Sequence, residues 1–120
     1  MSLTAEDFQH AGNAEWPASQ QAAEDAVADA IKTKLRDPDS AKFKFAPARP
    51  GIAYVAPSLK VTGVLMCGFV NSKNGYGGYV GDTPFFASIV THNGRSAAVV
   101  TVDEVSSHVA LKLCGSIVAA

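Results

Sequence analysis

The chain has 120 residues, of which 48% are hydrophobic and 18% are charged. This length and apolar content predict one compact domain and exclude a wholly disordered chain. Ten basic and eleven acidic residues give a net charge of -1, which argues against the basic field that nonspecific nucleic-acid binding requires. We therefore expect no nucleic-acid partner.

The sequence offers no membrane-spanning segment. Its longest strongly apolar stretch, Val61 to Val70, spans ten residues and contains Gly63 and Gly68, whereas a membrane helix needs roughly 20 residues. The first residues, with Glu6 and Asp7, also lack the positive and apolar regions of a signal peptide.

Charge is segregated along the first half of the chain. Residues 1–30 carry six acids and neither Lys nor Arg, whereas residues 32–60 carry seven bases and two acids. A nucleic-acid surface built on the bases is one interpretation. We favour another, in which acids early and bases late along one helix complement its macrodipole.

The clearest predicted element is a helix from Ala18 to Arg36. Pro17 suits its first turn, and Asp37-Pro38 ends it. Its apolar residues recur at steps of three and four and form one stripe of mostly small side chains: Ala23, Val27, Ala30, Ile31 and Leu35. Residues 1–16 show no sustained period and are interpreted as a flexible lead-in, with Trp16 anchoring the helix start. Residues 17–120 then form a single α+β domain.

After this helix, the apolar period changes to two, which is typical of strands. The pattern predicts short strands at 43–45 and 52–55, with turns at 49–51 and 57–58. The strongest strand, 60–71, is apolar on both faces and should lie centrally in the sheet. Strands at 85–92 and 96–100 should form a hairpin through Asn93-Gly94, the dipeptide that best suits a type I′ turn.

A C-terminal helix is predicted from the capping-box pair Thr101 and Glu104 through Leu113, with Gly115 ending it. A strand over 109–113 is the rival interpretation. The order of elements predicts an α+β fold: an N-terminal helix, a four- to five-stranded antiparallel sheet and a C-terminal helix, with the helices packed on one sheet face.

The segment 71–84, rich in Gly, Tyr and Asn, is the main candidate for a binding site. Glycine permits close backbone approach, while Tyr and Asn supply aromatic faces and adaptable hydrogen bonds. A long bulged hairpin whose tyrosines cover the sheet is the alternative. The candidate residues for binding a partner are Asn71, Lys73, Asn74, Tyr76, Tyr79 and Asp82.

The two cysteines, Cys67 and Cys114, are too few for a disulfide scaffold or a four-ligand zinc site. A central strand and the end of a covering helix could bring them together, and closing a loop of roughly 48 residues would stabilise the fold by about 4 kcal/mol. Two buried free thiols are the alternative. We expect no metal, no cofactor and no catalytic residue.

An enzymatic hypothesis needs Cys67 as a thiolate nucleophile. Its base would be His92 or His108, and Asp82 or Asp103 would orient that base. The mid-strand position of Cys67 argues against this hypothesis.

Residues 35–43 and 64–86 resemble a group of small bacterial proteins of unknown function. In that group a helix ends in a "KDPxSAxF"-like turn, and a later strand and loop run "VCGxVNxxNxxGGYxGxxxF", with a second cysteine near the C-terminus. The resemblance implies an exported, disulfide-bonded domain, periplasmic or secreted, with no catalytic residues.

Together these features predict a non-enzymatic binding or inhibitory module of the bacterial envelope, which presents segment 71–84 to a protein or glycan partner. The alternatives are a structural subunit that dimerises through an exposed strand edge and, behind it, a cysteine-dependent hydrolase. The oligomeric state is not predicted.

Overall fold

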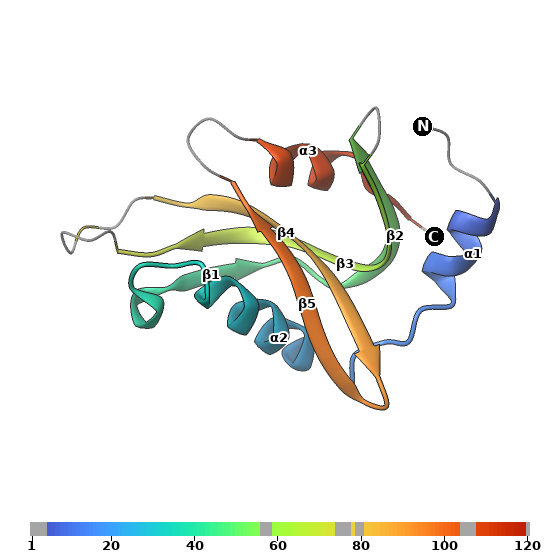
Figure 1. Ribbon diagram of the computed structural model, residues 1–120, viewed down its shortest axis with the longest axis horizontal. Helices are drawn as coiled ribbons and strands as arrows, with labels where there is room; N and C mark the ends of the chain where they lie inside the picture. The colour runs from blue at the N-terminus through green and yellow to red at the C-terminus, as the bar shows by residue number, and fades with distance from the viewer. Residues whose placement is uncertain (1–4, 56–58, 74–77, 79–80, 104–107, 120) are drawn as a thin grey trace.

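The structure is a computed structural model that describes residues 5–55, 59–73, 78, 81–103 and 108–119 (Figure 1). In chain order its elements are α1 (Ala5–Gly12), α2 (Gln20–Lys32), the 3₁₀ turn η1 (Pro38–Ser40), β1 (Lys42–Phe45), β2 (Arg49–Val55), β3 (Leu59–Asn71), β4 (Thr83–His92), β5 (Arg95–Val102), α3 (Val109–Gly115) and β6 (Val118–Ala119). The predicted α+β class is confirmed.

All strands belong to one antiparallel sheet with the order β5-β4-β3-β2-β6. Strand β3 lies centrally, as its two apolar faces predict. One edge of β3 is shared by two strands, because β1 pairs with residues 68–71 and β2 with residues 59–65. On the other edge, pairing with β4 ends at Val64 and Ile89. Beyond that point the β2–β3 end of the sheet curls away from the β4–β5 hairpin (Figure 1).

The helices cover both faces of the sheet, and the prediction that they share one face is wrong. Helix α2 packs on the face that carries Val64 and Met66 of β3. Helix α3 packs on the opposite face, which carries Leu65 and Phe86, and Figure 1 shows α2 and α3 on opposite sides of the sheet. The physical reason is that β3 and β4 are apolar on both faces, so each face needs a cover.

Residues 5–12, which the sequence placed in the lead-in, form helix α1 against β2 and β3. Ala11 is fully buried there. Helix α2 is shorter than predicted. It begins after Ser19, whose Oγ accepts a hydrogen bond from the N–H of Ala22, and ends at Lys32.

The macrodipole interpretation of the charge segregation holds only at one end of α2. The last turn contains Lys32, but the first turn contains no acidic residue. The acids of residues 5–29 therefore do not serve mainly to complement the dipole of this helix, and Lys32 is the basic residue of its last turn.

The start of β2 differs from the sequence prediction, and one turn is confirmed. Residues 49–51 begin β2 instead of forming a turn, and Pro50 is tolerated near the start of that strand. Asn93 and Gly94 have φ angles of 51° and 79°, as a type I′ hairpin requires.

The predicted capping box of the C-terminal helix is wrong. Thr101 lies in β5 and pairs with Phe86, and α3 begins only at Val109; Glu104 lies outside the described residues. Asp103 takes the capping role, because its carboxylate accepts hydrogen bonds from the N–H groups of Ala110 and Leu111 at 2.7 and 3.0 Å. Gly115 ends the helix, as expected.

Candidate functional site

Hydrogen bonds hold both ends of segment 71–84 where the segment leaves the sheet. The Oδ1 atom of Asn71, at the end of β3, accepts a hydrogen bond from the N–H of Gly81 at 3.0 Å. The N–H of Lys73 donates to Ser40 Oγ at 2.8 Å, and that hydroxyl donates to the carbonyl of Asp37 at 2.8 Å. The central strand and η1 therefore hold the base of the segment.

A salt bridge joins the C-terminal end of segment 71–84 to β1. Lys44 Nζ lies 2.6 Å from Asp82 Oδ2, and their side chains are 72% and 42% exposed. Exposed pairs of this kind contribute between about 0 and 1 kcal/mol. The pair therefore orients two charged groups at the surface more than it stabilises the fold.

The structure thus gives several of the predicted binding residues a definite place. Asn71 and Asp82 both contact other parts of the chain, and Lys73 is attached through its main chain. Asn74, Tyr76 and Tyr79 lie outside the described residues. Their predicted role as partner contacts stays a prediction.

Sequence reasoning missed Phe69, which is 42% exposed on the central strand. In the sheet register Phe69 pairs with Lys44 of β1 and with Pro84 of β4, so these three side chains form a row on one face. Lys42 pairs with Asn71 in the next row. Together with Asp82, these residues are called the Phe69 patch: Lys42, Lys44, Phe69, Asn71, Asp82 and Pro84.

A signal for the patch was present in the sequence but was ambiguous. Strand alternation places Phe69 on the same face as Cys67 and Asn71. The sequence alone does not tell how far the C-terminal helix covers that face. An aromatic residue within an apolar strand therefore looks like a core residue.

The predicted disulfide is present. Cys67 of β3 and Cys114 of α3 are bonded, with their Cα atoms 6.1 Å apart. The bond attaches α3 to the centre of the sheet, and Phe69 lies two residues beyond it along β3. The face is therefore covered as far as the disulfide and carries the exposed ring of Phe69 next to it.

The disulfide overturns the hypothesis of a cysteine nucleophile, because both cysteines are bonded and neither is a thiol. The groups proposed to assist it have other roles. His92 Nε2 lies 3.3 Å from Asn93 Nδ2, His108 precedes α3 at the surface, and Asp103 caps that helix.

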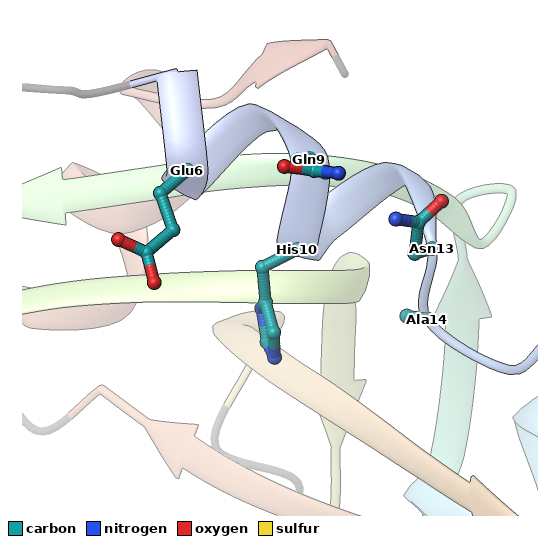
Figure 2. A pocket seen from close by; sticks show the side chains of 5 residues that line it. All are labelled: Glu6, Gln9, His10, Asn13 and Ala14. Carbon is teal, nitrogen blue, oxygen red and sulfur yellow. The ribbon is translucent and has the colours of Figure 1, made fainter.

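A second candidate region lies around α1. A cavity of about 310 Å³ is lined by Glu6, Gln9, His10, Asn13 and Ala14, whose side chains Figure 2 shows. A neighbouring cavity of about 210 Å³ lies where the pairing of β3 with β4 ends. There His10 Nδ1 lies 2.6 Å from Thr62 Oγ1. The larger cavity is lined by side chains of α1 and the segment after it, so it is a hollow on one side of a helix.

The α1 region contains no complete catalytic arrangement among the residues described. His10 is exposed and its Nδ1 is engaged by a threonine hydroxyl. Glu15 binds elsewhere, since its two oxygens accept from the N–H groups of Asn93 and Gly94 at 3.3 and 3.1 Å. The region therefore fastens the N-terminal segment to the hairpin tip.

Within the described part of the chain, no group of three or more His, Cys, Asp or Glu residues could hold a metal ion. None of the helices described is both long and apolar enough to cross a membrane.

No protein-family model, curated protein or solved structure matches the chain.

Proposed function

We propose that the protein is an exported, non-enzymatic binding module that presents segment 71–84, together with the Phe69 patch, to a partner in the bacterial envelope. The partner is a protein or a glycan. The observation that carries the proposal is the fastened base of the segment beside an exposed aromatic ring: Asn71 binds Gly81, Lys73 binds Ser40, and Phe69 is exposed next to them.

Fastening the base of a binding segment favours affinity, because less conformational freedom is lost when the partner binds. The segment begins at the end of the central strand β3 and leads into the neighbouring strand β4. Asn74, Tyr76 and Tyr79 are proposed to contact the partner, together with Lys73. Asn71 and Asp82 would act mainly by holding the segment in place.

The proposed location, periplasmic or secreted, is supported by the disulfide between Cys67 and Cys114. Disulfides persist in oxidising compartments and are rare in the cytosol. The resemblance of residues 35–43 and 64–86 to exported bacterial proteins supports the same proposal.

An affinity experiment tests the binding function. The wild type, a Tyr76→Ala/Tyr79→Ala double variant and a Trp16→Ala control are immobilised and exposed to a bacterial envelope extract. Trp16 is a suitable control because it is an exposed aromatic residue remote in sequence from the site. We expect a component that the wild type and the control retain and the double variant loses. Equal retention by all three proteins, or by none, would contradict the proposal.

A second candidate function, a structural subunit that dimerises through the sheet edge, is favoured by the outer face of the β4–β5 hairpin. Val99 of the edge strand β5 is 71% exposed and Val90 of β4 is 59% exposed. Both lie on the face opposite α2. Light scattering at high protein concentration tests it: a dimer that a Val99→Lys substitution dissociates would support it, and a monomer would exclude it.

A further inference from the structure

We propose that the partner of the Phe69 patch is an acidic polysaccharide, a glycan whose sugar rings carry carboxylate groups. This inference rests on the proposed binding function, since it names the partner class for the same end of the sheet. Three properties of the patch support it: its charge, its aromatic ring, and the hydrogen-bonding groups around that ring.

The end of the molecule that carries the patch is basic. Helix α2 runs toward this end and η1 lies there beside β1 (Figure 1). Residues 32–45 and 71–84 together contain six bases and three acids: Lys32, Lys34, Arg36, Lys42, Lys44 and Lys73 against Asp37, Asp39 and Asp82. Residues 5–31, by contrast, contain six acids and neither Lys nor Arg. Lys32, Lys34 and Arg36 lie in or just after α2, which packs on the sheet face opposite Phe69. On the face of the patch, Lys42 and Lys44 stand against one acid, Asp82, and this excess of positive charge favours an anionic partner there.

The ring of Phe69 stands on a rigid support. It projects from the central strand between β1 and β4, and the disulfide two residues away fixes the helix beside it. The negative face of an aromatic ring attracts the weakly positive C–H groups on the apolar face of a sugar ring. A single exposed ring on the sheet is therefore suited to one sugar unit.

Polar groups surround the ring at positions that suit sugar hydroxyls. The Lys44–Asp82 pair places an ammonium donor and a carboxylate acceptor 2.6 Å apart, so that neighbouring hydroxyls of one sugar can bond to both. The Asn71 side chain, whose Oδ1 accepts from Gly81, also carries an amide nitrogen, a donor of the kind that sugar hydroxyls bind.

A protein partner fits the patch less well. The buried centre of a protein interface is depleted in charged residues, and a stable interface covers about 800 Å² on each partner. In the patch, by contrast, one ring and one proline share two rows with Lys42, Lys44 and Asn71. This mixture of one apolar face with charged and amide groups is the chemistry of a sugar site.

The test measures binding of a short oligogalacturonate by calorimetry at low salt. Its methyl ester, which has the same sugars without the charges, serves as the matched ligand control. We expect the wild type to bind the acid form and to bind the ester at least about fivefold more weakly. Phe69→Ala should weaken binding about tenfold. Trp16→Ala, the matched exposed aromatic, should bind like the wild type.

Two charge variants of the patch should change its affinity for the acid form in opposite directions. Lys42→Gln should weaken binding of the acid form about two- to fivefold, and Asp82→Asn should strengthen it by a similar factor. Both residues are exposed. An unchanged midpoint of urea unfolding for each variant will separate a loss of binding from a loss of folding.

Several results would overturn the inference: no binding of the acid form, equal binding of its ester, wild-type affinity in Phe69→Ala, or equally tight binding of a poly-glutamate peptide, which would assign the patch to acidic polypeptides. These failures are distinct from failure of the proposed function. If the envelope extract still yields a component that depends on Tyr76 and Tyr79, the binding module stands with a different partner.

Discussion

Asn71 and Gly81 close the base of the candidate binding segment, since the side-chain Oδ1 of Asn71 accepts the main-chain N–H of Gly81 at 3.0 Å. Gly81 has a φ of +94°, a conformation that glycine adopts without strain. The contact joins the end of β3 to the segment that leads into β4.

Replacing Asn71 by Ala should release this base. We expect amide hydrogen exchange at Gly81 to accelerate and the free energy of unfolding to fall by about 1 kcal/mol, the net contribution of one hydrogen bond. Asn71→Asp keeps the acceptor oxygen and should largely preserve the slow exchange. If exchange at Gly81 is equally fast in the wild type and in both variants, the contact does not hold the segment.

The disulfide should contribute a large share of the stability. A Cys67→Ala/Cys114→Ala variant should unfold with a free energy lower by about 4 kcal/mol, because the unfolded chain is no longer cross-linked across these positions. Urea unfolding of the wild type with reductant should approach that of the variant. An unchanged midpoint on reduction would contradict the expected role of the bond.

Gly68 should not tolerate a side chain. A Cβ atom at this position would overlap the carbonyl oxygen of Lys44 and would lie 2.7 Å from the ring of Phe85. Gly68→Ala should therefore lower the free energy of unfolding by about 3 kcal/mol, since both obstacles belong to a packed sheet.

Gly115→Ala is the matched control for that substitution, because its Cβ would meet no atom within 4 Å. We expect a change within about 0.5 kcal/mol at this surface position. Thermal unfolding of the two variants side by side provides the measurement. Similar losses in both would show that close packing around Gly68 is not the cause.

Asp103 should stabilise α3 through its two hydrogen bonds to the main chain. Asp103→Ala should lower the free energy of unfolding by about 2 kcal/mol, the upper range for a lost helix cap, because the carboxylate is buried. Asp103→Asn retains one acceptor oxygen and should cost less. Hydrogen exchange at Ala110 and Leu111 should rise first in the Ala variant.

Glu15 should fasten the N-terminal segment to the β4–β5 hairpin. Glu15→Ala removes the acceptors of the Asn93 and Gly94 N–H groups, but these groups are exposed and can bind water instead. The loss of stability should therefore stay below about 1 kcal/mol. We expect a shift in the fluorescence of the neighbouring Trp16, and an unchanged spectrum would argue that the segment is held by α1 alone.

The parts of the fold that the sequence predicted are those with strong local signals. The two apolar faces of residues 60–71 predicted that β3 lies at the centre of the sheet. Asn93-Gly94 predicted the turn of the β4–β5 hairpin, which needs the two positive φ angles that these residues adopt. The disulfide followed from placing Cys67 on that central strand and Cys114 near the end of a helix.

The other features depend on contacts between distant residues. Helix α1 packs against β2 and β3, which lie far from it in the sequence, and Asp103 caps a helix that starts several residues later in the chain. The exposure of Phe69 depends on where α3 ends over the sheet, which the apolar pattern of β3 does not specify. For the same reason the sequence did not predict that Phe69 is exposed.

The pairing of β3 with both β1 and β2 along one edge also bears on the order of folding. Strands β2 and β3 are joined by a short connection, as are β4 and β5, so these hairpins can form from contacts close in sequence. Strand β1 can pair with residues 68–71 next, by extending the edge that β2 has already occupied. Helix α3 can dock only on the assembled sheet, and we therefore expect oxidation of Cys67 and Cys114 to be among the last steps of maturation, detectable as a reduced, sheet-containing intermediate during refolding.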